Sequence, residues 1–192
     1  MRRVRTAVLI SGNGSNLQAL IDAARDAQFP AEIVLVISNV PNVHGLTRAS
    51  AAQIPSMVLP HGNYDSREAF DNAVDAVLTQ HRIELVCLAG FMRVLSEPFT
   101  RQWAGKLINI HPSLLPKYKG LHTHRRALEA GDSEHGATVH WVTPELDSGE
   151  IILQQAIPIL ANETPEQLKE RVHVLEHMIY PLALAKVARE ML

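Results

Sequence analysis

Short apolar runs alternate with segments of helical spacing along the first 110 residues of the chain. Residues 4–10, 33–38, 84–89 and 107–110 are apolar with little polar alternation, as in strands that are covered on both faces of a parallel sheet. We therefore predict an α/β fold with a doubly wound, mostly parallel sheet. A fifth, short strand is predicted at residues 55–59, and helices are predicted at residues 16–26, 45–53, 65–81 and 98–103.

The pattern changes after Gly136. Residues 137–142 and 151–159 are two extended runs without a helical segment between them, which predicts a hairpin-like strand pair near the C-terminus. No internal repeat, low-complexity tract or linker interrupts the chain. We therefore expect a single domain over residues 1–192.

Two predicted helices begin with recognisable capping sequences. Asp-Ser-Arg-Glu at residues 65–68 has the form of a capping box, with the side chain of Asp65 as the cap. Thr-Pro-Glu-Gln at residues 164–167 combines a threonine cap with proline in the first turn. We expect a long helix to follow this second cap and to run toward Leu192.

Composition and charge are those of an ordinary globular protein. Hydrophobic residues make up 46% of the chain, and the formal net charge is −2, with no basic run beyond residues 1–5. We therefore expect neither a nucleic-acid nor a membrane partner. Because no secretory signal and no apolar run of about 18 residues is present, we expect a cytoplasmic location. The only cysteine, Cys87, lies in an apolar run, which indicates a buried side chain rather than a reactive thiol and excludes an intramolecular disulfide.

The most informative stretch is Leu-Ile-Asn-Ile-His-Pro at residues 107–112. Residues i and i+2 of a strand face the same side, so Asn109 and His111 are expected side by side. Pro112 cannot continue the strand ladder, which places the pair at the carboxyl end of the strand, where α/β proteins have their ligand crevice. An amide donor beside an imidazole that titrates near neutral pH is typical of an active site.

A glycine-rich loop, Ser-Gly-Asn-Gly-Ser-Asn at residues 11–16, joins the first strand to the first helix. Backbone N–H groups of such a loop at a helix N-terminus bind anions, so Gly12, Asn13, Gly14 and Ser15 are candidates for binding a phosphate. The loop lacks the Gly-Lys-Ser/Thr ending of a P-loop and the third glycine of a dinucleotide fingerprint. On these residues alone, a tight turn without a ligand is the alternative.

A carboxylate near a catalytic histidine orients the ring and stabilises its protonated form. Among twenty acidic residues, Asp147 is the best local candidate, because it lies in a glycine-containing connection between two apolar strands. The competing interpretation is that Asp147 only satisfies the backbone of its own turn.

Ten histidines raise the question of a metal site. His122 and His124 are spaced as a ligand pair, and His111, His135 and His140 lie in the same third of the chain. Neither a cysteine partner nor a His-Glu-x-x-His motif accompanies them, and the segment after His122 has the pattern of a helix start, which would separate the two rings. We therefore expect no metal.

Seven motifs are spread along the chain, namely ISGNGSNLQA at residues 10–19, LAGFMRVL at 88–95, NIHPSLLP at 109–116, GLHTH at 120–124, EHG at 134–136, LD at 146–147 and EHMIYP at 176–181. Together they resemble the phosphoribosylglycinamide formyltransferase family, the folate-dependent glycinamide ribonucleotide transformylases. Asn-x-His with a downstream Leu-Asp-x-Gly is the wider formyltransferase signature, and the Ser-Gly-Asn-Gly-Ser-Asn loop is the motif that distinguishes this branch. The resemblance covers essentially the whole chain.

The resemblance implies a Rossmann-like formyltransferase fold and a defined activity. Members of this family transfer the formyl group of 10-formyltetrahydrofolate to the amine of 5-phosphoribosylglycinamide in de novo purine biosynthesis. The acceptor amine is itself the nucleophile, so no serine or cysteine nucleophile is required. The family also implies a folate co-substrate without a metal, small-molecule partners only, and a monomer or weak homodimer.

The resemblance also implies roles for individual residues. Asn109 and protonated His111 would hold the oxyanion, and Asp147 would stabilise the charged ring and help to relay protons. Gly12, Asn13, Gly14 and Ser15 would bind the substrate phosphate in a half of the domain at about residues 1–100, and Glu176 would contact the ribose or glycinamide end. The folate would be bound mainly by residues of the other half, about 101–192. The folate-binding residues implied are Arg67, Met92, Arg93, Val94, Leu95, Asn109, Thr143, Pro144, Glu145, Leu146 and Asp147.

Three residues depart from the pattern of the family. Pro144 stands where an acidic residue is often found, Ser148 where glycine is common, and Lys119 where proline is frequent. The first two lie in the implied folate loop, so they bear on the rigidity of that loop.

The sequence disfavours two other classes of function. A methionyl-tRNA formyltransferase would need a second domain and a basic surface, and a formyltetrahydrofolate hydrolase typically carries an N-terminal regulatory domain, whereas here the first strand begins at about residue 4. A nucleotide-binding regulatory module with the same fold would have no need of Asn109, His111 and Asp147 together. Formyl transfer to the ribonucleotide is therefore the preferred interpretation.

Overall fold

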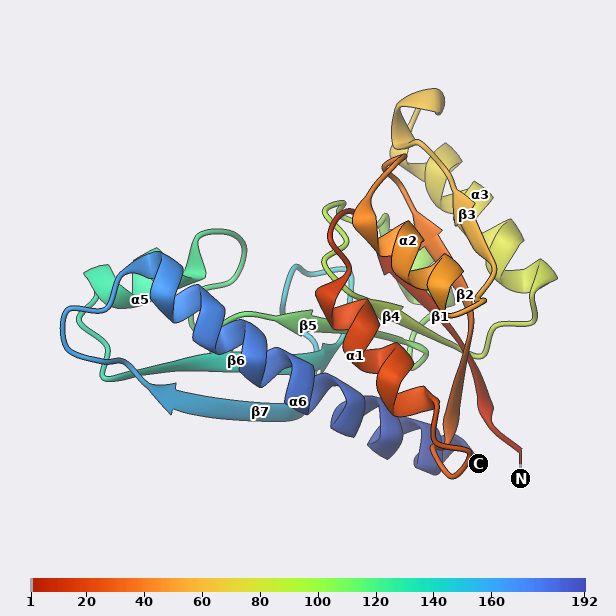
Figure 1. The fold of residues 1–192 in the computed structure, drawn as a ribbon. Helices are drawn as coiled ribbons and strands as arrows, with labels where there is room; N and C mark the ends of the chain where they lie inside the picture. Colours follow the sequence, from red (N-terminus) through yellow and green to blue (C-terminus); the bar gives the residue numbers. More distant parts are fainter. Residues whose placement is uncertain (1) are drawn as a thin grey trace.

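In the computed structural model, which describes residues 2–192, strands and helices alternate along most of the chain (Figure 1). The elements are β1 (Val4–Ile10), α1 (Ser15–Ala24), β2 (Ala31–Ser38), α2 (His44–Ala51), β3 (Ser56–Val58), a 3-10 turn (His61–Asn63), α3 (Arg67–Gln80), β4 (Leu85–Leu88), α4 (Glu97–Gln102), β5 (Leu107–His111), α5 (Thr123–Glu129), β6 (Glu134–Trp141), β7 (Ile151–Pro158) and α6 (Pro165–Met191).

The strands form one sheet in the order β3-β2-β1-β4-β5-β6-β7. The pairs from β3 to β5 are parallel, whereas β6 is antiparallel to both β5 and β7. The predicted doubly wound, mostly parallel sheet and the predicted C-terminal hairpin are therefore confirmed. Because the chain runs outward from β1 to β3 and then returns to β4 on the other side of β1, the carboxyl ends of these strands border the crevice where α/β proteins bind ligands.

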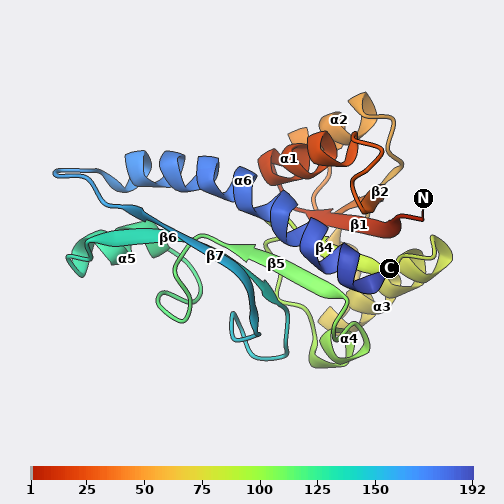
Figure 2. The same ribbon diagram turned by 90° about the horizontal axis from the view of Figure 1, so that it is seen from below.

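Successive side chains of the central strands enter two different cores. In β1, Val4 and Val8 belong to the core that α1 and α6 cover, whereas Ala7 and Leu9 belong to the core that α3 and α4 cover. Figure 2 shows these two helix layers on opposite faces of the sheet. Cover on both faces explains why the strands are apolar without alternation.

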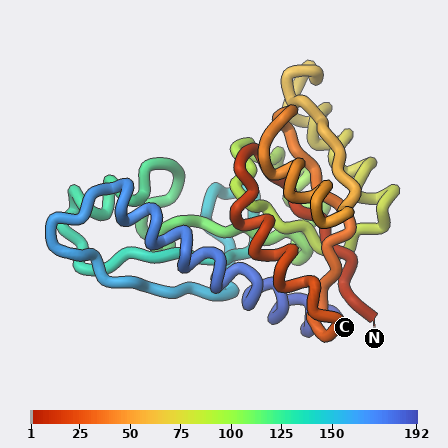
Figure 3. The backbone as a smooth tube through the Cα atoms, in the orientation of Figure 1, coloured from red at the N-terminus to blue at the C-terminus, as the bar shows by residue number. Residues whose placement is uncertain are grey.

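The long helix α6 lies beside α1, although these are the first and last helices of the chain (Figure 3). The predicted threonine cap at its start is confirmed, and it forms a full capping box, in which the Gln167 N–H donates to Thr164 Oγ1 at 3.2 Å and the Thr164 N–H donates to Gln167 Oε1 at 3.0 Å. Farther along, Tyr180 is fully buried and its hydroxyl donates to the carbonyl of Leu88 at 2.8 Å. Helix α6 therefore supports the end of β4, next to the crevice. Within residues 2–192, no helix is long and apolar enough to cross a membrane.

The capping box predicted at Asp65 is wrong. Helix α3 begins one residue later than that box requires, and its cap is Ser66, whose hydroxyl accepts the Ala69 N–H at 3.0 Å. Either side chain can cap a helix, and the backbone geometry of the preceding turn selects between them. Glu68 lies in the first turn, where its charge is favourable without the reciprocal hydrogen bond.

Strand β6 begins at Glu134, three residues before the predicted start at residue 137. The prediction treats Gly136 as a break between elements. In the structure Gly136 lies within the ladder, opposite Ala156 of β7. A Cβ atom there would overlap the carbonyl oxygen of Gln155, so the glycine permits a close approach of the two backbones. Strand β5 likewise continues one residue farther than predicted, to His111.

Candidate active site

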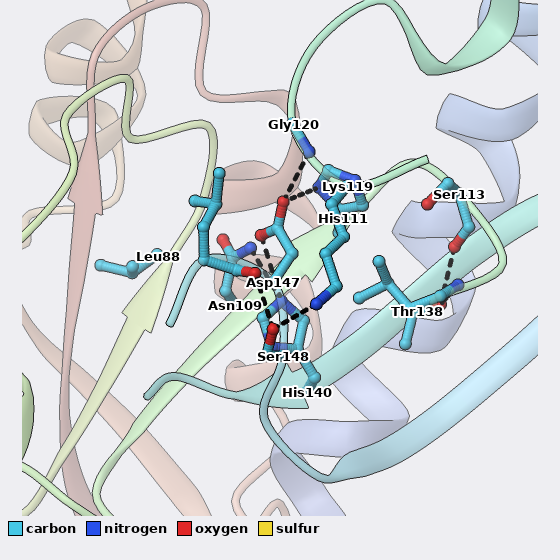
Figure 4. A network of polar contacts seen from close by, with 12 residues as sticks. Leu88, Asn109, His111, Ser113, Lys119, Gly120, Thr138, His140, Asp147 and Ser148 are labelled. Carbon is cyan, nitrogen blue, oxygen red and sulfur yellow. Dashed lines mark hydrogen bonds and ion pairs between the residues drawn. The ribbon is translucent and has the colours of Figure 1, made fainter. Parts of the chain in front are cut away.

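A cavity of about 790 Å³ lies at the carboxyl ends of β4 and β5. Its walls are the segment after β4, the segment between β5 and α5, the connection from β6 to β7 and the start of α6. Asn109, His111 and Asp147 all line it, and Figure 4 shows their side chains converging. The i, i+2 spacing of Asn109 and His111 thus brings both side chains to one cavity, as the strand pattern predicts.

The amide of Asn109 is oriented by His140, its partner in the β5–β6 ladder. Nδ1 of His140 lies 2.9 Å from the carbonyl oxygen of Trp141, and a carbonyl only accepts, so Nδ1 carries the ring proton. Burial lowers the pKa of His140, which favours the neutral ring. Nε2 therefore accepts a hydrogen bond from Asn109 Nδ2 at 3.2 Å, and among residues 2–192 the second N–H of that amide has no partner, so it can donate to a ligand.

His111 is nearly buried and is held by the carbonyl of Tyr118. Nε2 donates to this oxygen at 2.9 Å, so Nδ1 is the nitrogen that can gain or lose a proton. Tyr118 presents its carbonyl from a left-handed backbone conformation, with φ of 59°, in the turn that follows Pro112. In that turn the Ser113 hydroxyl donates to the Lys117 carbonyl at 2.7 Å.

Asp147 faces both histidines. Its Oδ2 lies 3.6 Å from Nδ1 of His111 and its Oδ1 lies 3.8 Å from Nε2 of His140, and its side chain is only 8% exposed. Oδ2 also accepts the backbone N–H of Gly120 at 2.8 Å (Figure 4). The competing interpretation, in which Asp147 serves only its own turn, is therefore incomplete, because its carboxylate contacts the segment between β5 and α5.

The glycine-rich loop lies outside the lining of this cavity and is held by α2. Gly14 has φ of 74°, and the Gly12 carbonyl accepts the Gly45 N–H at 3.1 Å. Arg48 donates from Nε to the Asn13 carbonyl at 2.9 Å and from Nη2 to Asn13 Oδ1 at 2.8 Å. A Cβ atom on Gly12 would meet nothing within 4 Å, so the space in front of this residue is open.

Glu176 is 4% exposed on α6, which is unlike the exposed helix residue that its charge alone would suggest. Burial raises its pKa to about 7, while a hydrogen bond with Asn16 acts in the opposite direction. Asn16 follows Ser15 directly, so the structure places Glu176 next to the glycine-rich loop. Within residues 2–192, Glu176 Oε2 has no hydrogen-bond partner, and Nε2 of His173 lies 3.6 Å away.

Replacing Glu176 with glutamine is expected to stabilise the free chain at high pH. An acid whose pKa is raised by folding costs stability once the pH exceeds its unfolded value, here 4.5, and the full cost is reached above pH 7. The free energy of unfolding of Glu176→Gln should therefore exceed that of the parent by about 2–3 kcal/mol at pH 8 and be nearly unchanged at pH 4.5. Urea unfolding at both pH values checks this. Glu170→Gln, an exposed change on the same helix, is the control, and a pH-independent difference for Glu176→Gln would contradict the assignment.

Most of the implied folate-binding residues line the cavity. Arg67 does not, since it lies exposed in the first turn of α3, and Glu145 does not either. Arg93 stacks over the Phe70 ring at 4.8 Å, and its buried Nε has no hydrogen-bond partner within residues 2–192. The implied residues on the cavity wall are Met92, Arg93, Val94, Leu95, Asn109, Thr143, Pro144, Leu146 and Asp147.

Sequence reasoning missed two residues that hold the site together. The sequence suggests His140 only as a metal ligand, whereas in the structure it orients Asn109. Arg48 is not among the predicted site residues, yet it donates a hydrogen bond to Asn13. His140 lies in a predicted strand that could pair with β5, but its contact with Asn109 could be predicted only if the register of the two strands were known. No sequence signal connects Arg48 with Asn13, since 35 residues separate them.

The histidines do not gather around a common point. Helix α5 begins at Thr123, and His124 lies 3.2 Å from His135, between Nδ1 and Nε2, rather than beside His122. Burial lowers the pKa of His124 to about 4. Among the residues that the structure describes, no group of three or more His, Cys, Asp or Glu side chains could hold a metal ion.

The hydroxyl groups that line the cavity belong to Thr100, Thr123 and Thr143. Its lining, within the described part of the chain, contains neither serine nor cysteine. Cys87 is fully buried in β4, and burial raises the pKa of its thiol to about 12. The arrangement can therefore stabilise negative charge and move protons, which suits a reaction whose nucleophile is supplied by a substrate.

Comparisons with known proteins identify the family of the chain. The family model for formyl transferases matches residues 4–184. The phosphoribosylglycinamide formyltransferase of Escherichia coli (strain K12) is 50% identical over 178 residues, which are 93% of this chain and 84% of that protein. The crystal structure of phosphoribosylglycinamide formyltransferase from Brucella melitensis superposes with a TM-score of 0.94 at 48% identity, covering 97% of this chain and 96% of that one.

Some relatives are much longer than this chain. The trifunctional purine biosynthetic protein adenosine-3 of Drosophila melanogaster is 56% identical over 186 residues, which are 96% of this chain but only 14% of that protein. The chain thus spans a small part of such relatives and most of the shorter ones. Sequence and fold together show that the chain belongs to the formyl transferase family, and within it to the phosphoribosylglycinamide formyltransferases.

Proposed function

We propose that this chain transfers the formyl group of 10-formyltetrahydrofolate to the amine of 5-phosphoribosylglycinamide. The products are N-formylglycinamide ribonucleotide and tetrahydrofolate, and the reaction belongs to de novo purine biosynthesis. The observation that carries the proposal is the convergence of Asn109, His111 and Asp147 on a cavity whose lining, within residues 2–192, contains neither serine nor cysteine. Acyl transfer to an amine needs such a set, because the amine attacks and the protein only has to stabilise charge and move protons.

The cavity has the properties that a folate would require. Its volume is within the range of small-molecule sites, about 300–1,000 Å³. Four exposed apolar side chains lie at its rim, namely Met92 (71% exposed), Val94 (50%), Leu121 (69%) and Leu146 (51%). Such side chains favour a flat aromatic ligand. The unpartnered Nε of Arg93 can donate to a ligand carbonyl or carboxylate.

In this proposal, Asn109 and His111 act on the formyl oxygen. The free N–H of Asn109 and the positive charge of His111, when Nδ1 is protonated, stabilise the negative charge that develops as the amine adds to the formyl carbon. The new bond joins this carbon to the acceptor nitrogen, and the bond to N10 of the folate breaks. The acceptor nitrogen loses a proton and N10 gains one. Asp147, 3.6 Å from His111, balances the ring charge and can hold the proton in transit.

The acceptor would extend from the glycine-rich loop to this cavity. The open space at Gly12 and the backbone N–H groups of residues 12–15 suit a phosphate, since the loop precedes the N-terminus of α1. Glu176, beside Asn16, suits the ribose or glycinamide end, because a buried carboxyl group favours hydroxyl or amine partners. The expected monomer or weak homodimer and the cytoplasmic location stay predictions.

The deciding experiment supplies both substrates to the purified chain. With 10-formyltetrahydrofolate and 5-phosphoribosylglycinamide, release of tetrahydrofolate should match formation of the N-formyl product one to one. Omitting the ribonucleotide should abolish the release. Release that continues without the ribonucleotide would instead assign the chain as a formyltetrahydrofolate hydrolase.

A further inference from the structure

Two loops that border the cavity are joined by a side-chain contact between Lys119 and Ser148. Lys119 lies between β5 and α5, and Ser148 lies in the connection from β6 to β7. Figure 4 shows the Lys119 ammonium group reaching across to the Ser148 hydroxyl, to which it donates a hydrogen bond.

The hydroxyl of Ser148 serves two partners at once. It accepts from Lys119 Nζ and donates to the Leu146 carbonyl at 2.9 Å, which closes the turn around Asp147. Lys119 is only 38% exposed, whereas its second partner, Glu145, is 78% exposed at a distance of 3.4 Å. The ion pair with Glu145 is therefore screened by solvent, and the hydroxyl contact is the one that fixes the lysine.

The contact lies directly beside the candidate catalytic carboxylate. Gly120, the neighbour of Lys119, donates its N–H to Asp147, the neighbour of Ser148, at 2.8 Å. The two loops are thus tied at two adjacent points, one through the backbone and one through side chains. Asp147 has φ of 48°, a left-handed conformation that aspartate adopts more readily than most non-glycine residues.

The geometry points to Lys119 and Ser148 as a pair of positioning residues, here called the loop latch, which holds the Asp147 loop closed over the folate side of the cavity. This inference rests on the proposed function only for the identity of the ligand. The latch is expected to slow the opening of the loop and hence the exit of folate, because Thr143, Pro144 and Leu146 belong to the cavity wall.

The first test needs no substrate. Amide hydrogen exchange is measured by mass spectrometry in the parent chain, Lys119→Met, Ser148→Ala and the double variant. Peptides covering residues 117–122 and 143–150 should exchange about threefold to tenfold faster in each variant, as expected for losing one partly exposed, charge-assisted hydrogen bond. The double variant should resemble either single variant, because both remove the same contact. Ser148→Thr keeps the hydroxyl and should restore slow exchange.

Lys117→Met is the matched control. It removes a lysine two residues away, whose ion pair with Asp132 at 2.9 Å lies away from the Asp147 loop. Exchange of residues 143–150 should not change in this variant. Unchanged exchange in Lys119→Met and Ser148→Ala, or effects that simply add in the double variant, would overturn the latch.

The second test separates positioning from general loosening. The dissociation rate of tetrahydrofolate, followed by stopped flow, should rise about threefold to tenfold in Lys119→Met and Ser148→Ala, while the KM for the ribonucleotide stays unchanged. A rise in both quantities would indicate a general structural defect and would overturn the positioning role. If the parent chain binds no folate, the proposed function fails, whereas the exchange experiment still decides whether the latch exists.

Discussion

Replacing His111 with alanine is expected to lower kcat by about 10²–10³, the typical cost of removing one donor from an oxyanion-stabilising site. The ring is nearly buried, its Nε2 donates to the Tyr118 carbonyl, and Nδ1 faces Asp147 at 3.6 Å, so the variant removes the charge that Asp147 is placed to balance. Asp147→Asn keeps the shape of the loop but removes the charge that balances the ring, and should lower kcat by about 10² or more. Initial rates of tetrahydrofolate release at saturating substrates measure both effects.

His111 and Asp147 act together, so the losses of kcat caused by the two substitutions should not add in a double variant. A double variant is expected to retain nearly the activity of His111→Ala, because the role of Asp147 is exerted through that ring. His81→Ala, at the end of α3 and away from the cavity, is the control for histidine loss. Full activity in either His111→Ala or Asp147→Asn would rule out the proposed mechanism.

Gly12→Val is expected to raise the KM for the ribonucleotide tenfold or more, about 1.4 kcal/mol in binding, or to abolish turnover. A Cβ atom on Gly12 meets nothing within 4 Å, and φ there is not positive, so the variant should fold. The added side chain would instead fill the space in which the phosphate is expected. Steady-state kinetics with varied ribonucleotide, together with circular dichroism of the free chain, check the prediction.

In contrast to the KM for the ribonucleotide, the affinity for folate should not change in Gly12→Val. The glycine-rich loop does not line the cavity, so the Kd of 10-formyltetrahydrofolate should stay unchanged in Gly12→Val. Gly62→Val is the matched control, because a Cβ atom there is equally free and lies in the 3-10 turn His61–Asn63. A folded Gly12→Val that loses folate affinity and keeps its KM for the ribonucleotide would show that the two subsites are exchanged.

Local features of the chain were predictable where one physical effect dominates. Apolar runs specify strands buried on both faces, and the threonine cap at residue 164 specifies the start of α6, because both depend on neighbouring residues only. The cap of α3 was misplaced by one residue, and β6 was begun too late at Gly136. In both cases two local interpretations were nearly equal; the turn before α3 selected Ser66 as the cap, and the close approach of β7 explains the glycine within β6.

The same distinction between local and long-range effects applies to the candidate site. The sequence by itself determined that Asn109 and His111 share one side of a strand end, since the strand period and Pro112 leave no choice. Its motifs also determined the family. Only the tertiary structure decided that His140 orients Asn109, that Asp147 faces His111 from a loop, that Arg48 holds Asn13 and that Glu176 is buried. These contacts join segments far apart in the chain, and sheet register, loop closure and helix packing set their distances, none of which is encoded by neighbouring residues alone.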